Sequence, residues 1–167
     1  KTGAGMMDCK SALVEAEGDM AVAERKLKER GVAAAAKRTG RATSEGRVFA
    51  QVGETGAALV ELSSETDFVA RNAEFVQLGD SVVQQVVDGQ ISEPTPELTA
   101  QVADAIGRIK ENIELRRILL LQRAGGDHIS SYIHGEGGIG VLVKLTAGGA
   151  ASHEAVATLG FDLALHV

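Results

Sequence analysis

Aromatic residues and cysteine are scarce in this chain of 167 residues. It has no Trp, one Tyr and four Phe, which is too few for the aromatic platforms on which single-stranded nucleic acids stack. Its only cysteine, Cys9, excludes an intrachain disulfide and fits a reducing compartment. No apolar run approaches the 18 residues that a membrane-spanning helix needs. These features favour a cytoplasmic protein that does not enter a membrane.

The charge of the chain is unevenly distributed. The formal net charge is −6, but residues 1–47 carry ten Lys and Arg against seven Asp and Glu, and residues 48–167 carry seven against sixteen. An acidic main body disfavours a ligand with a phosphate backbone. The apolar content of 44% and the charged content of 24% indicate a folded core and not a disordered chain. We therefore expect a protein partner and no direct nucleic-acid contact.

Residues 1–31 read as a small helical module. Two helices are expected at 8–17 and 19–30, joined at Gly18, with Asp19 as the N-cap of the second and Gly31 at its C-terminal end. Before them, Met6 and Met7 are adjacent in a Gly-flanked turn, suited either to contact with another protein or to filling the small core. Two helices cannot enclose a core, so a third element is expected before residue 1.

Residues 32–46 are interpreted as a basic linker. A run of four Ala favours helix, and Gly40 and Gly46 end it. Eight basic residues against two acidic ones lie between Arg25 and Arg47. Such a run is usually a solvated face, and RNA contact is the less favoured alternative.

Residues 47–149 have the pattern of an α+β domain in which helices pack beside an antiparallel sheet. Alternating apolar residues predict a hairpin at 47–53 and 57–64, a strand at 113–121 and a second hairpin at 129–134 and 139–145. Helical periodicity predicts a helix from the Asn72 cap to Gly89, one from the Thr95 cap with Pro96 at its first position, and a final one capped by Ser152. The hairpin residues Val48, Ala50 and Val52, followed by Ala58, Val60 and Leu62, alternate as in a half-buried strand pair.

The corner between the first hairpin and the next helix combines a carboxylate with an aromatic ring. Thr66 and Asp67 can each accept a hydrogen bond from a free N–H at a helix start. Phe68 follows directly, and it could either fold back onto the core or project into another molecule. Sequence order leaves both alternatives open.

Patterns that would indicate an enzyme are weak. Residues 135–140 spell GxGxxG, but a strand pattern follows where a phosphate-binding loop needs a helix, so we interpret them as a Gly-rich hairpin turn. The four histidines lie in different elements, and His128 and His134 would be about 20 Å apart along one strand, which rules out a shared metal. We expect no catalytic residues, no metal and no cofactor.

Two stretches carry a resemblance to a known family. Residues 2–13, TGAGMMDCKSAL, and 61–72, ELSSETDFVARN, resemble the two signature segments of bacterial elongation factor Ts, in the family's order. Residues 110–117 and 131–135 resemble further family segments. The resemblance implies an N-terminal ubiquitin-associated-like module at 1–31, a linker at 32–46, a first core half at 47–149 and, from 150–167, the start of a related second half that continues beyond Val167.

The resemblance also implies a function, namely guanine nucleotide exchange on elongation factor Tu during translation elongation, without direct nucleotide binding by this chain. Asp67 and Phe68 would enter the partner near its nucleotide-associated Mg²⁺, and Met6, Met7 and Lys10 would touch a partner helix. The residues that it assigns to partner contact are Met6, Met7, Lys10, Thr66, Asp67, Phe68, Val69, Ile109, Lys110 and His134. Ser11 and Lys110 depart from the family pattern, which usually has Lys and Gly there. A nucleotide-independent protein–protein adaptor is the alternative.

Overall fold

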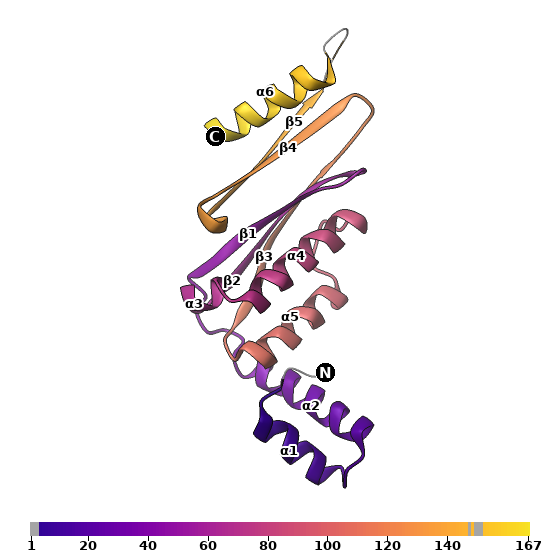
Figure 1. Ribbon diagram of the computed structural model, residues 1–167, viewed down its shortest axis with the longest axis vertical. Helices are drawn as coiled ribbons and strands as arrows, with labels where there is room; N and C mark the ends of the chain where they lie inside the picture. The colour runs from indigo at the N-terminus through magenta and orange to yellow at the C-terminus, as the bar shows by residue number, and fades with distance from the viewer. Residues whose placement is uncertain (1–3, 147, 149–151) are drawn as a thin grey trace.

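The fold is elongated and consists of three packed groups of elements (Figure 1). The computed structural model describes residues 4–146, 148 and 152–167. Two N-terminal helices form one end, a three-stranded sheet with two helices forms the middle, and a two-stranded sheet with the C-terminal helix forms the other end. Helices beside antiparallel sheets confirm the α+β class. The expected boundary at residues 149 and 150 and the first residues of the 2–13 segment lie outside the described residues.

Helices α1 (Met6–Glu15) and α2 (Met20–Ala36) pack together around Ala12, Ala16 and Ala23. Asp19 caps α2 as predicted, accepting a hydrogen bond from the Val22 N–H at 3.0 Å. The prediction that Gly31 ends α2 is wrong, because the helix continues through the Ala run to Ala36. The Ala run that follows Gly31 is a strong helix former and carries the helix past it.

The central sheet has the order β1 (Glu45–Val52), β2 (Gly56–Ser64), β3 (Ile113–Gln122), all antiparallel. In the register, Phe49 lies opposite Val60, and both are buried in the main core. Val48 lies on the other face, opposite Glu61. The two alternating sets predicted as one half-buried face therefore lie on opposite faces, and both faces of the sheet are covered.

Helices α4 (Ala73–Asp88) and α5 (Pro96–Ile109) cover one face of the sheet. Their caps are those predicted: Asn72 accepts from the Glu74 N–H at 2.8 Å, and Thr95 accepts from the Leu98 N–H at 3.3 Å. The fully buried core side chains from β2, α4 and α5 include Val60, Leu62, Phe75, Val82, Val83, Val86, Val87 and Leu98. Within the described residues, no helix combines the length and apolar character needed to cross a membrane.

The second sheet covers the other face of β1. It consists of β4 (Asp127–His134) and β5 (Ile139–Thr146), joined by the short helix η1 (Gly135–Gly137). A Cβ on Gly140 would lie 2.5 Å from Val48 of β1, so this glycine permits the close approach of the two sheets. The run at 135–140 is therefore a hairpin turn, as predicted. Helix α6 (His153–His166), capped by Ser152, packs on this sheet.

Strand β3 forms one edge of the central sheet. Its pairing with β2 shifts between Glu61 and Leu62, which leaves Arg116 as the extra residue of a β-bulge. The Arg116 side chain reaches across the sheet, donating to the Ser63 hydroxyl at 3.0 Å and to the Thr43 carbonyl at 2.6 Å. The bulge is thus fixed by side-chain hydrogen bonds.

Candidate partner-binding surface

The corner after β2 exposes an aromatic ring. Helix α3 (Asp67–Ala70) is a single turn whose N-cap is Thr66, with the Thr66 hydroxyl 3.4 Å from the Val69 N–H. Val69 and Ala70 occupy its inward side and belong to the main core. Phe68 therefore points outward and is 81% exposed. The alternative in which this ring folds back onto the core is wrong.

Two glutamates fix this corner to the α5–β3 loop. Glu111 accepts hydrogen bonds from the Thr66 N–H at 3.1 Å and from the Thr66 hydroxyl at 2.8 Å. In return, Glu65 accepts from the Asn112 N–H at 2.6 Å. Sequence reasoning missed Glu111 because its partner is 45 residues away. The only available signal was its place in the 110–117 family segment.

An ion-pair chain joins the corner to the β4–β5 hairpin. Arg71, the C-cap of α3, lies 3.5 Å from the Asp67 carboxylate and 3.6 Å from that of Glu136. Glu136, at the hairpin tip, also pairs with Arg47 of β1 at 3.4 Å. Figure 1 shows α3 and this tip at the same end of the two sheets. The hairpin tip is therefore tied to the corner through Glu136.

His134 and the methionines are at the surface. His134 is exposed, with its Nδ1 2.9 Å from the Tyr132 hydroxyl. Met6 and Met7 are 86% and 71% exposed, so neither fills the core of the helical module. Lys10, one turn further along α1, is also exposed. These side chains are all available for contact.

The loop at Lys110 lies between the methionines and the corner. The Lys110 ammonium is 3.9 Å from Asp8 of α1, and its carbonyl accepts a hydrogen bond from Arg38 at 3.0 Å. Its backbone is left-handed, with φ +71°, at the C-cap of α5. This conformation favours Gly, which is the residue that the resemblance leads one to expect there. Asp8, Lys110, Glu111 and Thr66 thus connect α1 to the corner.

Two of the ten expected contact residues face inward. Val69 is buried, and Ile109 is partly buried against the main core. They support the backbone of the corner and of the α5 terminus. The other eight are exposed or partly exposed: Met6, Met7, Lys10, Thr66, Asp67, Phe68, Lys110 and His134.

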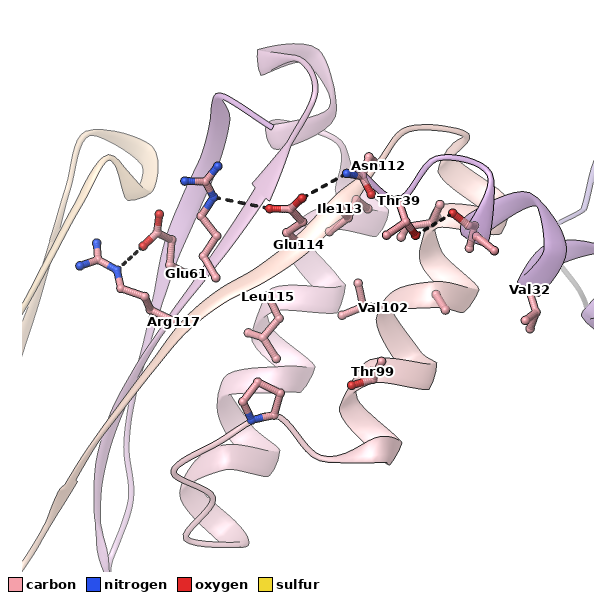
Figure 2. A pocket seen from close by; sticks show the side chains of 16 residues that line it. Val32, Thr39, Glu61, Thr99, Val102, Asn112, Ile113, Glu114, Leu115 and Arg117 are labelled. Carbon is pink, nitrogen blue, oxygen red and sulfur yellow. Dashed lines mark hydrogen bonds and ion pairs between the residues drawn. The ribbon is translucent and has the colours of Figure 1, made fainter. Parts of the chain in front are cut away.

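A large hollow lies elsewhere, between α2, α5 and the edge strand β3 (Figure 2). Its volume is about 940 Å³, and its floor is apolar, with Val102, Ile106 and Leu115 among its residues. The charged side chains at its rim pair with one another, Arg117 with Glu61 at 2.6 Å and Arg116 with Glu114 at 3.9 Å. The groove therefore presents no unpaired charged group of the kind that would activate a substrate.

Carboxyl groups with a lowered pKa lie away from the corner. Hydrogen bonds from Arg30 and Ser11 lower the pKa of Glu15, and a hydrogen bond from the Thr146 hydroxyl lowers that of Asp127. Among the residues that the structure describes, no group of three or more His, Cys, Asp or Glu could hold a metal ion. The corner presents instead an exposed aromatic ring, Phe68, next to the Asp67 carboxylate.

Comparison with known proteins assigns the chain to a family. The family model described as "Elongation factor TS" matches residues 65–167, a range that begins at the corner. Elongation factor Ts of Treponema denticola is 42% identical over 145 residues, covering 87% of this chain and 52% of the relative. The proteins of the same name from Symbiobacterium thermophilum and Aeromonas salmonicida are 43% and 39% identical over alignments that cover all of this chain and 57% of each relative. The chain spans about half the length of these curated relatives, and it belongs to the elongation factor Ts family.

Proposed function

We propose that this chain promotes GDP release from elongation factor Tu in the cytoplasm, with Phe68 and Asp67 as the residues that enter the partner. The observation that carries the proposal is the exposure of the Phe68 ring beside a carboxylate on a corner fixed by hydrogen bonds. Membership of a family of translation elongation factors supports the choice of partner.

The mechanism is competition between binding states. Phe68 inserts between helices of the partner, and Asp67 disturbs the Mg²⁺ and phosphate site, so the chain binds nucleotide-free partner better than GDP-bound partner. Because coupling between two ligands is reciprocal, GDP must weaken binding of the chain by the same factor. No covalent bond is made or broken, so the chain acts without catalytic residues and without binding nucleotide itself.

The size of the effect follows from the exposed ring. Burying a Phe side chain contributes roughly 1.5–3 kcal/mol, and about 1.4 kcal/mol corresponds to a tenfold change in an equilibrium constant. Docking of Phe68 alone therefore accounts for roughly ten- to hundredfold preference for the nucleotide-free state. Asp67 adds to this by placing a negative charge near the phosphates.

The remaining exposed residues extend the contact. Met6, Met7 and Lys10 would meet a partner helix from the helical end, since flexible methionine side chains adapt to a shallow surface. Lys110 and His134 would flank the corner on either side. Thr66, Val69 and Ile109 contribute by holding the backbone beneath these side chains.

The test is stopped-flow release of fluorescently labelled GDP from elongation factor Tu, with the chain in excess. Release should accelerate with the wild-type chain, and Phe68→Ala should reduce the acceleration roughly ten- to hundredfold. Phe161→Ala is the matched control, because Phe161 is also exposed but lies on α6 against the other sheet. Equal acceleration by wild type and Phe68→Ala would refute the proposal.

A nucleotide-independent adaptor is the second candidate, and the exposure of Met6 and Met7 favours it. An adaptor would bind its partner through the helical end with an affinity that does not depend on whether the partner holds nucleotide. Titrating GDP against the complex distinguishes the two functions. A fall in the affinity of the chain as GDP rises excludes the adaptor, and a constant affinity excludes exchange.

A further inference from the structure

The ladder between β2 and β3 ends where the corner begins. Its last backbone pair is Ser64 with Ile113. Continuing this antiparallel register places Glu65 opposite Asn112 and Thr66 opposite Glu111. In both of these positions a carboxylate replaces the backbone acceptor: Glu65 takes the Asn112 N–H at 2.6 Å, and Glu111 takes the Thr66 N–H at 3.1 Å.

This arrangement satisfies donors that a strand end would otherwise leave unpaired. Hydrogen bonds to an ionised acceptor are stronger than those between neutral groups. The buried Asn112 side chain strengthens the junction further, donating to the Arg41 carbonyl at 2.8 Å. The chain therefore leaves the sheet in one defined direction at Thr66.

Glu111 also controls the cap of α3. The Thr66 hydroxyl donates its proton to Glu111 Oε1 at 2.8 Å. The lone pairs of the hydroxyl oxygen therefore face the Val69 N–H, which lies 3.4 Å away. Without Glu111 the hydroxyl could rotate, and the single turn that carries Phe68 would lose both its backbone anchor and its oriented cap.

We propose that Glu111 is a positioning residue that pre-organises Phe68 for entry into the partner. The inference rests on the proposed exchange function, which it deepens. A large side chain that is already held in its bound direction loses less conformational freedom on association than one on a mobile corner. Glu111 itself need not touch the partner, since it acts through Thr66.

The first experiment examines the corner of the free chain by amide hydrogen exchange. In Glu111→Gln, exchange at Thr66 and Val69 should accelerate roughly tenfold, because a charged acceptor is lost. Exchange in α4 should not change. Glu97→Gln is the matched control, since Glu97 contacts Thr95 at the opposite end of α5. Unchanged exchange at Thr66 and Val69 in Glu111→Gln overturns the positioning role.

The second experiment is a double-mutant cycle in the GDP-release assay. Glu111→Gln should reduce the acceleration roughly five- to tenfold in the wild-type background, and less than about twofold in the Phe68→Ala background. If Glu111→Gln reduced the acceleration by the same factor in both backgrounds, Glu111 would not act through the ring, and the inference would be overturned. Thr66→Val, which removes the hydroxyl, should resemble Glu111→Gln. Circular dichroism confirms that each variant is folded.

The two experiments separate the inference from the function on which it rests. If Glu111→Gln loosens the corner but neither it nor Phe68→Ala alters GDP release, the proposed function fails and the structural link between Glu111 and α3 stands. If Phe68→Ala slows release and Glu111→Gln leaves both the corner and the rate unchanged, the positioning role alone fails.

Discussion

Gly79, in the middle of α4, faces the Phe49 ring so closely that even one methyl group has no room. A Cβ built on Gly79 would lie 2.1, 2.2 and 2.3 Å from three carbon atoms of that ring. Both residues are buried, and Phe75 lies against Phe49 with ring centroids 6.1 Å apart. We expect Gly79→Ala to destabilise the fold.

The magnitude follows from two opposing effects. Non-bonded carbon atoms attract best at about 3.5–4.0 Å, so the ring or the helix must move by roughly 1.4 Å to reach that range. Overpacking of this kind costs about 1–3 kcal/mol, and the better helix propensity of Ala returns about 1 kcal/mol. Because Phe75 blocks the ring on another side, we expect a net loss of about 1–2 kcal/mol.

Urea unfolding followed by circular dichroism measures this loss. Gly31→Ala is the matched control, since Gly31 is also inside a helix but a Cβ there would meet nothing within 4 Å. This control should gain about 0.8–1.0 kcal/mol from propensity alone. Adding Phe49→Leu to Gly79→Ala should recover part of the loss, as expected for two residues in contact. A Gly79→Ala protein as stable as wild type would refute the packing argument.

Three further predictions concern single side chains. Phe68→Ala should change the free energy of unfolding by less than about 0.5 kcal/mol, because the ring is 81% exposed; a loss above about 1 kcal/mol in urea would show that the ring supports the fold. Lys110→Gly should raise the free energy of unfolding by up to about 1 kcal/mol, because Gly adopts the left-handed backbone at φ +71° without strain. Urea unfolding would show a higher midpoint with an unchanged slope. A lower midpoint would mean that the ion pair with Asp8 outweighs the strain. The Thr146 hydroxyl and then the Ala124 N–H lower the pKa of Asp127, so this carboxylate stabilises the fold above its unfolded pKa of about 3.9 and the contribution is lost as the pH falls through the folded pKa. Asp127→Asn should therefore lower stability at neutral pH and flatten its decline in acid, and parallel curves for the two proteins would contradict this.

Sequence signals identified the features that depend on neighbouring residues. Asp19, Asn72, Thr95 and Ser152 cap the predicted helices, because a capping side chain reaches only two or three residues along the chain. The second hairpin followed from period-two alternation and its Gly-rich turn.

The features that sequence could not supply depend on distant contacts. The close approach of α2 to α5 depends on Gly107, where a Cβ would lie 3.0 Å from the Gly31 Cα. Exposure of Phe68 depends on Val69 and Ala70 filling the core side of α3. The hydrogen bonds of Glu111 depend on the register between β2 and β3, which brings it to Thr66, 45 residues earlier in the chain. The last two of these features shape the candidate surface, which is why it was less predictable than the fold.

The bulge at Arg116 has a consequence for the behaviour of the chain in solution. Strand β3 is ten residues long and borders the central sheet, and an unpaired strand of that length can nucleate aggregation with other chains. The extra residue interrupts the spacing of its free N–H and C=O groups, and the highly exposed Arg117 adds a charge beside it. Both features disfavour edge-to-edge pairing of β3 with a second copy of the chain.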